Sequence, residues 1–206
     1  MIFNINNNNS MYELFLLTNY NGTLLASKYR SQLSNFLEIL CVLKGLKPGY
    51  LGSNDNTLGY NIAQIKDLIN EDGKKIQNFT YYPNTNLIVN NKILKNIDFD
   101  PNTISTSMYD KDDTIKLGKL LGYPCPGINF NSTNVKSISF NLNVSDTFRK
   151  LFNYTDKYKL QIIGFRCDYN YNDEIYLQLI MLKDQLDYYF NNILNFGKIY
   201  LEITNS

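Results

Sequence analysis

The residue in the most distinctive chemical setting is Cys125, which stands between two prolines in the sequence LGYPCPG. A thiol becomes a nucleophile when a helix N-terminus or a neighbouring cation lowers its pKa. Gly122, Pro124 and Pro126 instead predict a stiff turn just after the C-terminal end of a helix, where the helix dipole acts in the opposite sense. We therefore expect Cys125 to be a buried structural residue, with a reactive thiol as the alternative.

A second group of chemically capable side chains surrounds the end of a predicted strand, where Arg166 and Asp168 are followed by Tyr169, Tyr171 and Asp173. A cleft formed by these residues would bind a polar ligand. Two carboxylates can divide acid and base roles when their surroundings push their pKa values apart. The alternative is a solvated turn, in which a surface ion pair contributes little to stability.

Carboxylates that could hold Mg²⁺ or Ca²⁺ gather between residues 98 and 113. They are Asp98, Asp100, Asp110, Asp112 and Asp113. Their order does not match the D-x-[DN]-x-[DN]-G pattern of a calcium loop. Capping of a helix N-terminus explains the last three more simply. We therefore predict no metal site and no cofactor.

Histidine is missing from the whole chain. This absence excludes catalytic triads and dyads that use an imidazole, zinc fingers with histidine ligands and the two-histidine iron site. The three cysteines, Cys41, Cys125 and Cys167, have no C-x-x-C spacing. A framework of disulfides is not predicted, and a reducing, cytoplasmic compartment fits this cysteine usage best.

Composition favours a single globular domain over residues 1–206, of which 44% are hydrophobic. The first ten residues, MIFNINNNNS, are expected to form a loose N-terminal segment without a secretory signal. A net charge of +1 argues against a protein that neutralises many phosphates or a polybasic membrane-surface protein. No run approaches the ~18 apolar residues of a membrane span.

The periodicity of apolar residues changes along the chain and predicts a mixture of helices and strands. Strands are predicted at 12–18, 137–144, 159–167 and 198–204, a hairpin at 76–89, and helices at 27–44, 58–70, 110–122, 147–152 and 173–195. Residues 48–57 are predicted to form a loop. Because helices and strands do not strictly alternate, we predict an α+β domain with a mainly antiparallel or mixed sheet packed against amphipathic helices.

The helix at 27–44 has an apolar face that includes Leu33, Leu37 and Cys41, and its polar face carries Glu38. Gly45 is expected to end it. The long helix at 173–195 has one continuous apolar stripe, and Gly197 is expected to end it. Its members are Ile175, Leu179, Leu182, Leu186, Tyr189, Phe190, Ile193 and Leu194.

The composition, rich in asparagine, tyrosine and isoleucine and free of histidine, together with the element LGKLLGYPC at 117–125, resembles uncharacterised proteins of large AT-rich DNA viruses that infect amoebae. The resemblance implies residence in the host cytoplasm and attaches no activity to the element.

Two functions are compatible with these observations. The first is a non-catalytic protein-interaction domain that binds a protein partner, such as a host factor, or associates with itself. It is favoured by the missing imidazoles, the near-neutral charge and the absence of catalytic spacing. The alternative is a histidine-independent enzyme that acts on a small polar or phosphorylated substrate through Cys125 or the Arg166, Asp168 and Asp173 group.

Overall fold

A computed structural model describes the following residues of the chain: 30–52, 79–82, 85, 87–94, 99–104, 111–125, 134–152, 154–157, 159–168 and 171–205. Several predicted features lie outside these residues. They are the N-terminal segment 1–10, the strand at 12–18 and the helix at 58–70.

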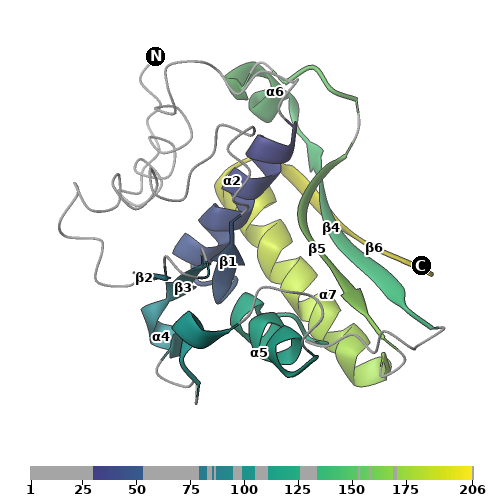
Figure 1. Cartoon of the computed structure of the whole chain (residues 1–206). Helices are drawn as coiled ribbons and strands as arrows, with labels where there is room; N and C mark the ends of the chain where they lie inside the picture. The colour runs from purple at the N-terminus through teal and green to yellow at the C-terminus, as the bar shows by residue number, and fades with distance from the viewer. Residues whose placement is uncertain are drawn as a thin grey trace.

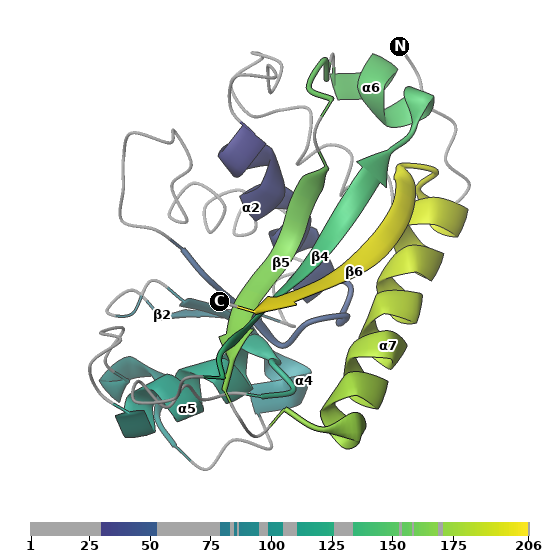
Figure 2. The ribbon, with the colours of Figure 1, turned by 90° about the vertical axis from the view of Figure 1, so that its right-hand side faces the viewer.

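The larger of two antiparallel sheets contains β5 (Leu160–Cys167), β4 (Lys136–Val144) and β6 (Gly197–Asn205), in that order across the sheet. β4 pairs with β6 over nine residues, from Lys136 opposite Asn205 to Val144 opposite Gly197. A bulge at Phe140 and Asn141 interrupts its pairing with β5. All three strands were predicted. Figure 2 shows the sheet with α7 running beside β6 at the margin of the molecule.

The smaller sheet has the order β1 (Gly49–Leu51), β3 (Leu87–Asn90) and β2 (Phe79–Tyr82), again antiparallel. β2 and β3 form the predicted hairpin. The prediction of a loop over 48–57 is wrong at β1, where Tyr50 pairs with Ile88. Three residues carry no periodicity, so only the long-range pairing with β3 makes them a strand.

Helices lie on one side of the larger sheet and around the smaller one (Figure 1). The long ones are α2 (Arg30–Leu43), α5 (Lys111–Leu121) and α7 (Asp173–Asp187). The short ones are α4 (Asn91–Leu94), η4 (Pro101–Thr103), α6 (Asp146–Phe152) and the π-helix η5 (Tyr188–Ile193). The prediction of an α+β domain with an antiparallel sheet is confirmed, with two sheets in place of one. No described helix combines the length and apolar character needed to cross a membrane.

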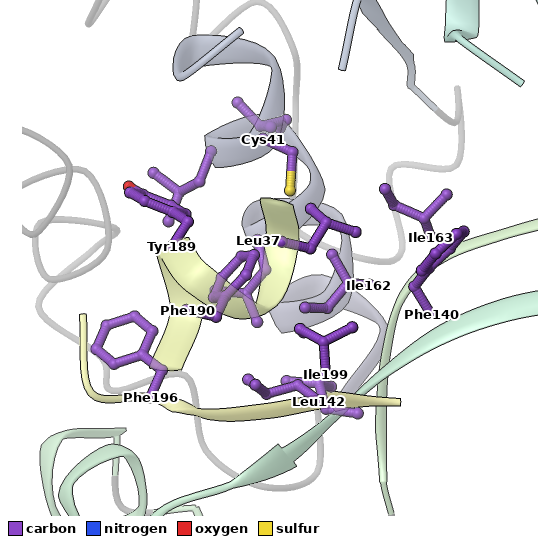
Figure 3. Close-up of a cluster of buried hydrophobic side chains, with 14 of the residues drawn as sticks. Leu37, Cys41, Phe140, Leu142, Ile162, Ile163, Tyr189, Phe190, Phe196 and Ile199 are labelled. Atoms are coloured by element: carbon purple, nitrogen blue, oxygen red, sulfur yellow. The ribbon is translucent and has the colours of Figure 1, made fainter. Parts of the chain in front are cut away.

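The main core forms where α2 and the end of α7 meet the inner face of the larger sheet (Figure 3). Leu37 and Cys41 of α2 face Phe190 of η5, and Phe140 and Ile199 come from the strands. All five are at most 2% exposed. The apolar spacing predicted for these helices therefore does identify the core.

α2 and α5 end in the same way. At the end of α2, the N–H of Gly45 donates to the Val42 carbonyl at 3.0 Å, and the Leu46 N–H donates to Cys41 at 2.9 Å. Gly45 has a φ of 70°, and Gly122, at the end of α5, has a φ of 75°. This pair of bonds with a left-handed glycine is a Schellman cap. Both predicted stop residues are confirmed.

α7 ends differently from its prediction. Asn195, with a φ of 54°, takes the left-handed conformation after η5, whereas Gly197 already belongs to β6. Asparagine tolerates this conformation because its short polar side chain can bond locally.

The chain leaving α2 crosses the end of α5 at very short range. A β-carbon on Gly122 would lie 2.2 Å from Cδ of Pro48, and one on Gly49 would lie 2.7 Å from the Leu120 carbonyl oxygen. Neither distance leaves room for a side chain. The two glycines therefore allow the smaller sheet and α5 to pack together.

This corner gives a first test. We expect Gly122→Ala to lower the free energy of unfolding by about 2–4 kcal/mol, because it adds a clash with Pro48 to the cost of a left-handed alanine. Gly45→Ala is the matched control. It has nearly the same φ, but its β-carbon would lie 3.8 Å from Asn90, so a loss of only about 1 kcal/mol is expected. Urea unfolding measures both, and equal losses would contradict the steric role of Pro48.

Candidate functional site

Cys125 has no free thiol, because it forms a disulfide with Cys167. The two Cα atoms are 5.6 Å apart, a usual separation for this bond. Cys125 is buried, as expected. This disulfide was not predicted, since a disulfide framework was considered unlikely, and the inference of a reducing compartment loses its basis. The partners are 42 residues apart in sequence, and only the packing of the α5 exit against β5 brings them together.

The described members of the second predicted group differ in their exposure to solvent. Arg166 is exposed, Asp168 is buried and Asp173 is exposed in the first turn of α7. Tyr171 is half-buried, with the Lys136 ammonium 5.7 Å from its ring centre. Tyr169 lies outside the described residues.

The aspartates considered as metal ligands have other roles where they are described. Asp100 caps η4 by accepting from the Asn102 N–H at 2.9 Å. Asp112 and Asp113 occupy the first turn of α5. Asp98 and Asp110 lie outside the described residues. Among the described residues, no three His, Cys, Asp or Glu side chains are close enough together to hold a metal ion.

A cleft of about 700 Å³ opens between α2, β1, the end of α5 and β5. Its lining is partly polar and partly apolar. The residues are Ser34, Asn35, Glu38, Tyr50, Leu51, Leu121, Tyr123, Gln161, Ile162 and Gly164. None of the residues proposed from the sequence as a catalytic site lines it.

Glu38, one of the residues that line this cleft, forms an ion pair with the buried Lys47. The Lys47 ammonium donates to the Glu38 carboxylate, and the two side chains are 3% and 17% exposed. The ammonium also lies 5.3 Å from the ring centre of Tyr123. Tyr123 in turn stacks on Phe165 at 4.3 Å. Glu38 was placed on the polar face of the helix, but its cationic partner was not predicted, since Lys47 lies beyond the helix end.

The titration of the groups near this ion pair is shifted away from neutral pH. Burial alone would lower the pKa of Lys47, but the charge of Glu38, helped by Tyr123 and the hydrogen bond, raises it above its ordinary value. Burial raises the pKa values of Tyr50 and Tyr123, and it raises that of the Cys41 thiol far above its usual range. Lys47, Tyr50, Tyr123 and Cys41 therefore keep their protons at neutral pH, so none of these four groups is a general base there.

A different surface stands out on α7. Leu177, Met181 and Tyr188 are 62%, 63% and 61% exposed. With 3.6 residues per turn, these three positions fall within about 40° of each other around the helix. Leu179 and Leu186, which are fully buried, lie on the opposite side. α7 therefore has two apolar faces, one in the core and one directed outward. We call Leu177, Met181 and Tyr188 the outer stripe.

Helical periodicity in the sequence predicted the inner apolar series of α7 but not the outer stripe. The spacing of the stripe, four residues and then seven, was available as a pattern in the sequence. The stripe was not recognised, because the inner series alone already explained an amphipathic helix. The Glu38 and Lys47 pair left no comparable pattern, because nothing local links the two residues.

Comparison with known proteins does not add to this geometry: no family model, no curated protein and no solved structure matches the chain. The two sheets, the cleft and the outer stripe are therefore the basis for assigning a function.

The disulfide gives a second test. Replacing both Cys125 and Cys167 with serine should lower the free energy of unfolding by about 4 kcal/mol, because the bond closes a 42-residue loop of the unfolded chain. Thermal or urea unfolding of the oxidised proteins measures this loss. The unfolded, unreduced wild-type chain should react with a thiol reagent at Cys41 only. Three reactive thiols would contradict the assignment.

The third test is the dependence of stability on alkaline pH. Lys47, Tyr50 and Tyr123 all have folded-state pKa values above their ordinary values of 10.5, 10.0 and 10.0. The folded protein then holds protons that the unfolded chain releases above about pH 10, so stability is full below that pH and falls as pH rises. Urea unfolding between about pH 8 and 11 measures the slope.

The matched variant for this test is Lys47→Met with Glu38→Gln, which removes both charges. Its stability should fall less steeply above about pH 10 than that of the wild type. Lys47→Met alone should cost about 3 kcal/mol at neutral pH, because it leaves a mostly buried carboxylate without its cation. A wild-type stability that is flat up to pH 11 would contradict the raised pKa values.

Proposed function

We propose that the protein is a non-catalytic protein-interaction domain that binds its partner on the outer stripe of α7. The observation that carries this proposal is the exposure of three large apolar side chains along one line of a helix. Exposed apolar patches of this kind mark interaction sites, because water leaves both surfaces on binding. Methionine and tyrosine suit such a surface, since Met adapts its shape and Tyr combines a large ring with a polar end.

The chemistry of the remaining candidates supports binding in preference to catalysis. Cys125 is bonded to Cys167, so it offers no thiolate in this state. Arg166 and Asp168 differ in exposure and do not line the cleft. Glu38, which lines the cleft, is already paired with the ammonium of Lys47. No observation on the described residues favours the enzymatic alternative over an interaction domain.

A selection experiment tests the proposed surface without knowledge of the partner. Random peptides displayed on phage are selected on the immobilised protein and then measured on the double variant Leu177→Ser/Met181→Ser. We expect most selected peptides to lose about tenfold or more in affinity for this variant, because its apolar contacts are gone. Circular dichroism should show an unchanged fold, since both side chains are exposed.

The control variant is Tyr200→Ser on β6, where the exposed fraction of the side chain is 43%. It removes an apolar side chain elsewhere and should leave binding unchanged. Peptides that bind the wild type and the Leu177→Ser/Met181→Ser variant equally would place the interaction elsewhere and overturn the proposal.

A further inference from the structure

The outer stripe has the spacing of a coiled-coil seam. Leu177, Met181, Asp184 and Tyr188 follow one another at intervals of four, three and four residues. Apolar residues at these intervals form the line along which two helices pack, knobs into holes. Asp184 occupies one position of this line, and its side chain is 65% exposed. The seam therefore combines three apolar positions with one carboxylate.

The charges on α7 are strongly one-sided. Four acidic residues and one lysine lie between Asp173 and Asp187, although the whole chain carries a net charge of +1. By helical spacing, Asp173 and Glu174 flank the N-terminal end of the seam, and both are exposed. The helix dipole is a sufficient reason for acidic residues in the first turn. It gives no reason for Asp184, which lies near the other end of α7.

The neighbours of Asp184 leave it available to a partner. Lys183 donates to Asp184 at 3.0 Å, and this pair involves adjacent residues at the surface, where an ion pair is weak. Asp187, the remaining acid, has a structural role, because it accepts from the Ile199 N–H at 2.7 Å. Asp184 is thus the carboxylate that a docked helix would cover.

A second copy of this chain is a poor occupant of the seam. In a parallel pair of α7 helices, Asp184 would face Asp184 of the other copy. In an antiparallel pair centred on the seam, Asp184 would face Met181. Both arrangements bring together two helices with more acidic than basic residues, and neither places a cation of the other copy opposite Asp184, whose own partner is the adjacent Lys183 at the surface. The charges therefore favour a different partner, one that supplies the cation.

We propose that the outer stripe binds a cationic amphipathic helix of a partner protein, whose apolar residues pack on Leu177, Met181 and Tyr188 while a lysine or arginine faces Asp184. This inference rests on the proposed function and adds the chemistry of the partner. Helices bound in this way present anchors at intervals of three and four residues. The acidic groups around the stripe attract such a helix and repel an acidic one. A single charged position in the seam also sets the register of the two helices.

The test uses synthetic helical peptides of about three heptads. The first has leucine along its seam, one central lysine in the seam and lysine on the flanks. The second is identical but has glutamate at every lysine position. Fluorescence anisotropy of the labelled peptides measures binding to the wild type. We expect the cationic peptide to bind about tenfold or more tightly than the acidic one, with an affinity that falls as salt rises.

Variants of the protein separate charge from apolar contact. Asp184→Lys should weaken binding of the cationic peptide and strengthen binding of the acidic one, because the sign of the charge in the seam is reversed. Leu177→Ser/Met181→Ser should weaken the binding of both peptides. Tyr200→Ser should change neither. All these side chains are exposed in the wild type, so folded variants are expected and circular dichroism checks them.

The outcomes distinguish this inference from the proposed function. If both peptides bind the wild type equally but lose affinity for Leu177→Ser/Met181→Ser, the stripe is a protein-binding surface, and the inference that its partner is cationic is wrong. If neither synthetic peptide binds while the selected phage peptides depend on the stripe, the inference that the partner is a helix is wrong. A wild-type dimer in sedimentation velocity that Leu177→Ser/Met181→Ser converts to a monomer would show that the occupant is a second copy.

Discussion

The close crossing of residues 47–49 over the end of α5 is the constraint on which the arrangement of the two sheets depends. Three consecutive residues each meet a different part of that helix end. The Lys47 ammonium lies over the Tyr123 ring, Pro48 fills the space beside Gly122, and Gly49 approaches the Leu120 carbonyl. Steric repulsion rises so steeply at these distances that the two segments have little freedom to shift. The cleft and the position of Tyr123 against β5 follow from this contact.

The same crossing explains why the Glu38 carboxylate beside the cleft is paired with a cation. It brings Lys47 to Glu38, so each buried charge has a partner. It also places the exit of α5 beside β5, where Cys125 and Cys167 are bonded and Tyr123 stacks on Phe165. Cys125, Lys47 and Glu38 are thus engaged in contacts that hold the structure together. The outward face of α7 instead exposes apolar side chains together with acidic residues.

Prediction from the sequence succeeded where the information was local. The strands β4 and β5 alternate or concentrate apolar residues. The helix predicted at 147–152 forms as α6 and is capped by Ser145, whose hydroxyl oxygen accepts from the Phe148 N–H at 3.2 Å. The failures share one cause, which is contact between distant residues. β1 is a strand only because β3 pairs with it, and Glu38 has an ion-pair partner only because Lys47 folds back toward it. At the candidate site, the spacing of Leu177, Met181 and Tyr188 was present in the sequence, but their exposure could not be known.

The sequence by itself determined α2, α5, α6 and α7, the glycine caps of α2 and α5 and the division of apolar residues into a core, because propensity, capping and periodicity act between neighbours within a few residues. It also excluded imidazole chemistry, since a missing residue type cannot be restored by folding. Only the tertiary structure decided that Cys125 pairs with Cys167, that Lys47 neutralises Glu38 and that one of the two apolar faces of α7 is left outside. These contacts and this exposure depend on which surfaces pack together after the chain has closed its loops. A pattern among neighbouring residues does not specify that packing.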